Sequence, residues 1–127
     1  PSGNGVIDFS TLATLRSLQQ PGQPDIANKI IRIYMAEAPA LLKQLADAET
    51  AHDTVALSKA AHALKSSSFN VGALELATHC KELEAIGRSG STAGITPLMR
   101  SIESGYRKAI SQLEQELEGS DERHNLA

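Results

Sequence analysis

The segment AAHALKSSSFNVGA, residues 60–73, places a histidine inside a run with the periodicity of a helix. Successive helix residues turn by about 100°, so one narrow sector collects the residues that should face the core, namely Leu57, Ala61, Leu64, Ser68 and Val71. His62 lies roughly 140° from the centre of that sector, which directs its ring outward rather than into the core. Lys65, one turn further along, falls on the same outward side.

This pair of side chains has a chemical logic. An imidazole nitrogen near neutral pH is a nucleophile toward an activated phosphoryl group, and a nearby ammonium can stabilise the negative charge of the product. Spacing alone leaves a second interpretation open, because His and Lys three residues apart also occur by chance on solvated helix faces.

Three further side chains, Ser58, Ser66 and Phe69, share the outward arc of His62. Small residues beside the ring leave room for a second protein to bring a reacting group in line. An exposed aromatic is a typical docking contact, although Phe69 could instead fold back over the protein. We therefore expect Ser58, Ser66 and Phe69 to contact a partner.

Five segments with helical periodicity must position these residues, at about 8–19, 25–50, 53–70, 73–88 and 95–117. Asp8 or Ser10 can cap the first segment and Asp53 the third, while Gly72 should end the third. Pro39 lies inside the second segment, where we expect a kink or a one-turn break rather than an end.

The apolar positions of these segments predict an all-α fold. The second segment should face the core with Ile26, Ile30, Ile33 or Tyr34, Ala38, Leu41, Leu45 and Ala48, and the fifth with Ile95, Leu98, Ile102, Tyr106, Ala109, Leu113 and Leu117. Long amphipathic helices with short connections form an antiparallel four-helix bundle, here with an additional short N-terminal helix. We expect residues 1–7 to be a linker, 8–118 the bundle and 119–127 a flexible tail.

Composition excludes several classes of protein. The formal net charge is −3, without the excess of positive charge that binding to nucleic acid requires. One cysteine cannot form an internal disulfide, and no apolar run approaches the roughly 18 residues of a membrane span. We expect a cytoplasmic, monomeric domain without membrane contact. The linker-like start PSGNG suggests a piece of a longer polypeptide.

The string AHALKSSSFNVGA strongly resembles the signature of histidine phosphotransfer (HPt) domains. In that signature a helix carries His, then Leu-Lys two and three residues later, small residues, and Gly-Ala ten and eleven residues after the His. The segments YMAEAPALLKQL (34–45) and LATHCKELEAIGRSG (76–90) look like the neighbouring helices of the family, so the resemblance covers about residues 25–117.

The resemblance implies a phosphorelay function. His62 would be the phosphoacceptor, through Nε2, and Lys65 would contact the phosphoryl oxygens. Receiver domains would be the partners, and they would supply the Mg²⁺, so no intrinsic cofactor or autonomous kinase activity is expected. The chain would be the C-terminal domain of a hybrid sensor histidine kinase. Ser66 stands where the family commonly has Gly, which puts the choice of receiver in question.

Two alternatives come from other classes of protein. Glu49-x-x-His52 matches half of a di-iron bundle site, but such a site needs two of these motifs and two further Glu. A helical interaction bundle that no longer accepts phosphate is the second alternative. Cys80 lies on an apolar stripe and should be core. We assign no role to His52, His79 or His124.

Overall fold

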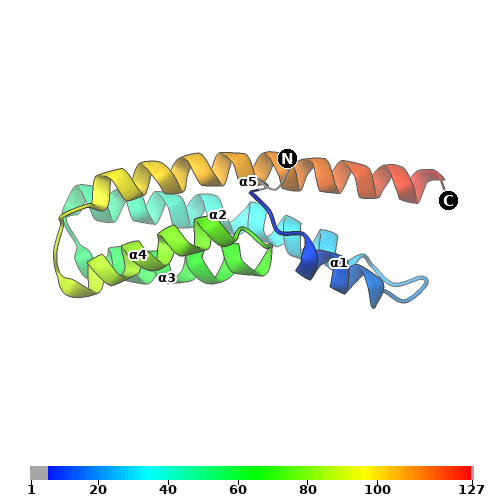
Figure 1. The fold of residues 1–127 in the computed structure, drawn as a ribbon, viewed down its shortest axis with the longest axis horizontal. Helices are drawn as coiled ribbons and strands as arrows, with labels where there is room; N and C mark the ends of the chain where they lie inside the picture. Colours follow the sequence, from blue (N-terminus) through cyan, green and yellow to red (C-terminus); the bar gives the residue numbers. More distant parts are fainter. Residues whose placement is uncertain (1–5, 127) are drawn as a thin grey trace.

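The computed structural model describes residues 6–126, with side chains through residue 119. It contains the helices α1 (Ser10–Ser17), α2 (Ile26–Ala51), α3 (Thr54–Asn70), α4 (Leu74–Ser89) and α5 (Ile95–Leu126). Helices α2 to α5 lie side by side with alternating directions, and α1 lies beside the beginning of α2 (Figure 1). The described residues contain no strand. The predicted antiparallel four-helix bundle with a short N-terminal helix is confirmed.

Aspartates begin both α2 and α3. The side chain of Asp25 accepts a hydrogen bond from the backbone N–H of Asn28, and that of Asp53 accepts one from Ala56, each at 3.0 Å. These contacts satisfy N–H groups that have no partner inside the helix. The predicted cap at Asp53 is therefore confirmed, and it fixes the start of the helix that carries His62.

The inward face of α3 is the one that the helical wheel predicted, since Leu57, Ala61, Leu64, Ser68 and Val71 are all buried. In α2 the prediction was wrong for Ile26, which is 43% exposed, and of the two alternatives Ile33 and Tyr34 it is Tyr34 that is buried. The buried stripe instead runs through Ala27, Ile31 and Tyr34. Because isoleucines stand next to one another in this helix, the sequence does not show which side faces the core. The buried Tyr34 ring marks that side.

Helix α2 runs through Pro39 without interruption, so the predicted one-turn break is absent. Pro39 lies on the exposed side of the helix. Its missing N–H leaves one carbonyl without an intrahelical partner, and a carbonyl on the exposed side can bond to water instead.

Helix α5 ends later than the sequence pattern indicated. The expected end at about residue 117 is wrong, because helical backbone continues to Leu126. Gly119 costs a helix interior only about 1 kcal/mol, too little to end α5 by itself. Flexibility of residues 119–127 stays a prediction.

Contacts with the bundle begin before residue 8, the expected start of the bundle. Residues 1–5 of the expected linker lie outside the described residues. Ile7, however, is buried, and its N–H donates to Gln112 Oε1 of α5 at 2.9 Å. The next N–H, of Asp8, donates to the carbonyl of Gly72 at 2.8 Å. The chain is therefore already part of the bundle at Ile7.

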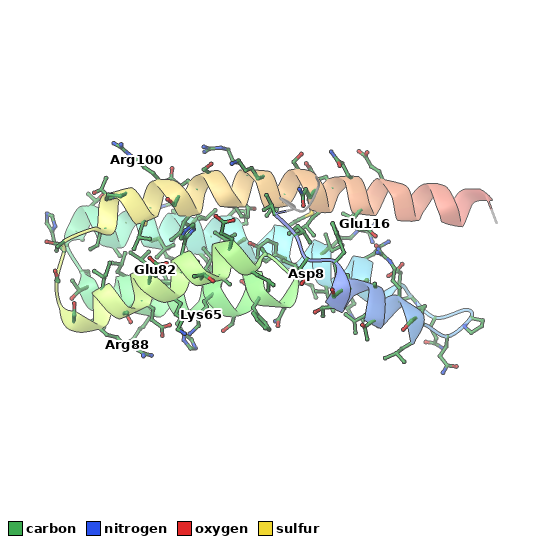
Figure 2. All side chains as sticks on the ribbon, in the orientation of Figure 1. Asp8, Lys65, Glu82, Arg88, Arg100 and Glu116 are labelled. Carbon is green, nitrogen blue, oxygen red and sulfur yellow. The ribbon has the colours of Figure 1, made fainter. Side chains whose placement is uncertain are left out.

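Arg16 connects α1 to the bundle through side-chain hydrogen bonds. Its guanidinium donates to Glu116 of α5 and to Asn28 Oδ1 of α2, the latter at 2.5 Å. Figure 2 shows Glu116 on the part of α5 that faces α1. Helix α1 thus serves as a brace across the end of the bundle where α2 begins.

Candidate functional site

His62 and Lys65 project from the outer face of α3. The His62 side chain is 58% exposed, and the Lys65 side chain is 29% exposed. Both lie outside the buried stripe of the same helix, as the wheel predicted. The structure therefore presents the ring on the surface, beside an ammonium group one turn along.

The two side chains meet on a buried carboxylate of α4. Glu84 is 3% exposed. Its Oε2 lies 2.8 Å from His62 Nδ1, and its Oε1 accepts a hydrogen bond of 2.8 Å from Lys65 Nζ. Arg88, one turn further along α4, donates to Oε2 at 2.7 Å. Figure 2 shows Lys65 and Arg88 along the same edge of the bundle, away from Arg100 on α5.

Sequence reasoning missed Glu84. It follows Cys80 by four residues and precedes Gly87 by three, and all three are buried on the face that α4 turns to the bundle. A carboxylate on an otherwise apolar stripe is a usable signal, because charged side chains are almost never buried without partners. Which side chains pair with Glu84 could be identified only from the structure.

The electrostatics of the cluster fix its protonation pattern. The Lys65 N–H is the main cause that lowers the pKa of Glu84, with further contributions from His62 and Arg88, while burial opposes them. Glu84 is therefore ionised at neutral pH and can only accept hydrogen bonds. The contact with His62 then requires a proton on Nδ1, and in the neutral ring this leaves the Nε2 lone pair free and directed away from Glu84.

A groove of about 510 Å³ runs beside His62 between α3 and the last turns of α4. Its lining includes Val55, Ser58 and Lys59 from α3, and Gly87 and Arg88 from α4. The helices approach closely here, since a Cβ on Gly87 would lie 2.9 Å from the Thr54 carbonyl oxygen and 3.0 Å from Ser58 Cβ. Of the expected contact residues, Ser58 therefore lies in this groove.

The other expected contact residues lie on the opposite side of His62 along α3. Phe69 is 62% exposed, which excludes the alternative in which it folds back over the bundle. Ser66 is exposed as well. The site therefore has a groove towards the start of α3 and an exposed aromatic towards its end.

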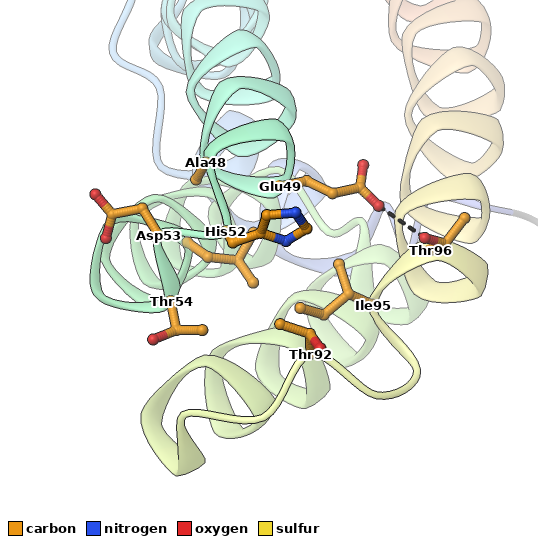
Figure 3. A pocket seen from close by; sticks show the side chains of 9 residues that line it. Ala48, Glu49, His52, Asp53, Thr54, Thr92, Ile95 and Thr96 are labelled. Atoms are coloured by element: carbon orange, nitrogen blue, oxygen red, sulfur yellow. Dashed lines mark hydrogen bonds between the residues drawn. The ribbon is translucent and has the colours of Figure 1, made fainter.

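A separate cavity of about 200 Å³ lies at the end of the bundle where α2 meets α3 (Figure 3). Glu49 accepts a hydrogen bond of 2.9 Å there from the Thr96 hydroxyl, and His52 lines the same cavity. Within residues 6–119, no group of three or more His, Cys, Asp or Glu is placed to hold a metal ion. Glu49 and His52 thus belong to the end of the bundle, apart from His62.

The remaining candidate residues have simpler places. Cys80 is fully buried in the core, as predicted, and burial raises the pKa of its thiol to about 12, so the thiol stays neutral. His79 is partly exposed on α4. The side chain of His124 lies outside the described residues. No helix among those described is long and apolar enough to cross a bilayer.

The structure is thus an antiparallel helical bundle with an exposed histidine whose Nδ1 contacts a buried carboxylate, beside the cations of Lys65 and Arg88. The chain belongs to the Hpt domain family, whose model matches residues 29–123. This confirms the identification that the motif around His62 suggested.

Two relatives illustrate the family. Histidine-containing phosphotransfer protein 2 of Arabidopsis thaliana is 24% identical over 103 residues, which make up 79% of this chain and 66% of that protein. The chain thus spans slightly less than two thirds of this relative. The crystal structure of histidine-containing phosphotransfer protein B (HptB) from Pseudomonas aeruginosa PAO1 superposes with a TM-score of 0.80 at 28% identity, covering 88% of this chain and 94% of that one.

Proposed function

We propose that the domain accepts a phosphoryl group on His62 Nε2 from the phospho-aspartate of one receiver domain and passes it to the aspartate of another. The observation that carries this proposal is the 2.8 Å contact between His62 Nδ1 and Glu84, because it leaves Nε2 as the free nucleophile on an exposed ring. Membership of the Hpt domain family supports the same reaction.

Lys65 has the position to stabilise the transferred group. An ammonium has three N–H donors, and the contact with Glu84 occupies one of them. The others can reach the phosphoryl oxygens on the adjacent ring. Arg88, whose side chain is 70% exposed, adds a second positive charge at the edge of the site. These charges offset the negative charge that arrives with the phosphoryl group.

The partner completes the reaction centre. We assign the Mg²⁺ to the receiver, where it would neutralise the transferred group beside the aspartate. The domain itself supplies the nucleophile and local positive charge, with no kinase activity of its own. We place it in the cytoplasm as a monomer, within a longer hybrid sensor kinase.

Docking would use the face of α3 that surrounds His62. Phe69 offers an apolar anchor, while Ser58 and Ser66 are small enough to allow close approach of a receiver helix. Ile33 of α2 is also exposed, and it lines a cavity of about 220 Å³ between α2 and the end of α3. The apolar surface at this end of α3 therefore extends onto α2.

The test is transfer from a phosphorylated receiver with Mg²⁺. The expected result is label on the domain in an acid-labile, alkali-stable form that distinguishes phosphohistidine from acyl phosphate. His62→Gln should remove the label while the free energy of unfolding changes by about 1 kcal/mol or less, since the side chain is largely exposed. His79→Gln, a partly exposed histidine of α4, is the matched control and should label normally. If no receiver of the same organism labels the unmodified domain, the interaction bundle without phosphotransfer replaces this proposal.

A further inference from the structure

A second groove, of about 410 Å³, lies between α4 and α5. Its charged and hydroxyl-bearing lining residues are Glu75 and His79 of α4 and Arg100, Ser101, Ser104 and Lys108 of α5. Helix α3 packs on α2 and α4, whereas α5 packs on α4 and α2, so α4 separates this α4–α5 groove from the groove beside His62. Figure 2 shows Arg100 on the edge of the bundle opposite Lys65. A partner that docks on the outer face of α3 therefore need not cover the α4–α5 groove.

The two cations of the α4–α5 groove are available to a ligand. Neither Arg100 nor Lys108 forms an ion pair or a hydrogen bond with any side chain that the structure describes. Between residues 95 and 113, α5 also carries Arg107, against one carboxylate, Glu103. The groove therefore presents positive charge on a protein whose net charge is −3, which favours an anionic partner at this place.

Between the two cations, the groove has free hydroxyls and an apolar floor. The Thr78 hydroxyl bonds to a carbonyl of its own helix at 3.0 Å, but the hydroxyls of Ser101 and Ser104 form no hydrogen bond among the described residues. Gly105 has no side chain, and a Cβ added there would lie 3.7 Å from Leu76 Cδ1. The groove is therefore open above Leu76, with room for an apolar side chain of a ligand.

We propose that the α4–α5 groove binds an extended acidic segment of a partner protein. Arg100 and Lys108 are eight positions apart, which corresponds to about 12 Å along α5. In an extended peptide, residues i and i+4 are about 13 Å apart, and residues i, i+2 and i+4 face the same side. The segment therefore carries Asp or Glu at i and i+4, paired with the two cations, and an apolar residue at i+2 over Gly105. This inference does not depend on phosphotransfer by His62.

The shape of the groove selects a peptide over a small free anion. A compact dianion cannot reach two cations that are about 12 Å apart along a helix, and it gains nothing from the apolar floor between them. Glu75, on the α4 side of the groove, repels carboxylates, so the acidic side chains face α5. Ser101 and Ser104 lie between the two cations along α5, where their hydroxyls can donate to backbone carbonyls of the segment.

The probe that tests this inference is a synthetic peptide, Ser-Glu-Thr-Leu-Thr-Glu-Ser with blocked ends, titrated into the ¹⁵N-labelled domain. The amide signals of residues 75–79 and 100–108 should shift, and those of residues 58–66 should not. The affinity should fall as NaCl is raised from about 0.05 M to about 0.5 M, because salt screens the ion pairs. The same peptide with Gln in place of both Glu is the control, and it should bind at least about fivefold more weakly.

Single substitutions test each contact. Arg100→Gln and Lys108→Gln should each weaken binding of the peptide about threefold to fivefold, as loss of a partly exposed ion pair does. Arg107→Gln is the matched control, since Arg107 is exposed on the same helix but does not line the groove. Glu75→Gln should tighten binding about twofold to threefold, because it removes a negative charge from the groove. Glu82→Gln should leave the affinity unchanged, since Glu82 is an exposed glutamate of α4 outside the groove (Figure 2).

Three results would overturn the inference. Equal affinities of the Glu and Gln peptides would exclude recognition of charge in the groove. Succinate, whose two carboxylates are too close together to reach both cations, should not compete with the peptide, and competition at similar concentrations would make the groove a site for small anions instead. Transfer from a phosphorylated receiver to His62 should proceed at the same rate when peptide saturates the domain, and blocked transfer would place the peptide on the face of His62.

Discussion

Tyr34 Oη and Ser68 Oγ lie 2.8 Å apart and form a buried hydrogen bond between α2 and α3. Ser68 belongs to the same helix as His62, on its inward face. Burial raises the pKa of Tyr34 above its usual range, so the hydroxyl remains protonated and can donate. This bond connects α3, the helix that carries His62, to Tyr34, the largest buried side chain of α2.

Tyr34→Phe should lower the free energy of unfolding by about 1–3 kcal/mol, because it leaves the Ser68 hydroxyl buried without a partner. The double variant with Ser68→Ala should be less destabilised than the sum of the two single variants, since it removes both polar groups together. Urea unfolding of the four proteins measures this coupling. Additive effects would show that the hydroxyls do not stabilise each other.

Gly87→Ala should cause a steric clash between α3 and α4 beside His62. The added Cβ would lie 2.9 Å from the Thr54 carbonyl oxygen, which is backbone and cannot move aside cheaply. We expect a loss of about 1–3 kcal/mol in the free energy of unfolding, as for other overpacked contacts. Gly105→Ala is the control, since its Cβ would lie 3.7 Å from Leu76, an ordinary contact. That helical substitution should stabilise the protein by up to about 1 kcal/mol, and thermal unfolding of both variants compares them directly.

Much of the site could be predicted because it is local to one helix. The outward direction of His62 and Lys65 follows from positions along α3 alone, so the wheel located both. Glu84 lies 22 residues from His62 and 19 from Lys65 along the chain. Its contact depends on the relative position of α3 and α4, which the close approach at Gly87 sets and no periodicity reports.

The fold differed from the prediction where local signals are weak. Ile26 is as apolar as Ile31, so only packing of neighbouring helices could decide which of the two is buried. Gly119 resembles a stop signal, yet nothing else in the sequence terminates α5 there. Number and order of helices, by contrast, follow from strong breaks such as PGQP and from aspartate caps.

Glu84 should make the stability of the domain depend on acid pH. Hydrogen bonds from Lys65 and His62 lower its pKa below the ordinary value of 4.5. A carboxyl with a lowered pKa in the folded state stabilises the fold fully above its unfolded value, and the contribution is lost as pH falls through the folded value. The difference in free energy of unfolding between the parent and Glu84→Gln should therefore be larger at pH 7 than at pH 3. Urea unfolding at both values measures it, with Glu82→Gln as the control, and a difference independent of pH would contradict the ion pairs.

Lys65→Ala should slow phosphotransfer without removing acceptance by His62. A hydrogen bond to a charged group contributes about 1.5–3 kcal/mol, which corresponds to a rate change of about 10- to 100-fold. The lifetime of phosphohistidine should shorten as well. Single-turnover transfer from a labelled receiver gives the rate. Lys81→Ala removes one charge from an exposed position of α4 and should transfer normally, whereas normal kinetics of Lys65→Ala would exclude Lys65 from the site.

Phe69→Ala should weaken binding of a cognate receiver by about 1–2 kcal/mol, as expected for loss of an exposed aromatic anchor at a small interface. Leu18→Ala is the matched control, because Leu18 is 71% exposed at the end of α1. In a titration with receiver and Mg²⁺, amide signals of residues 58, 62, 65, 66 and 69 should move together while α5 stays unchanged. Ser66→Gly should widen the set of receivers that transfer to His62, since it removes a side chain from the approach to the ring. Equal affinities of Phe69→Ala and Leu18→Ala would move the docking surface to the groove that contains Ser58.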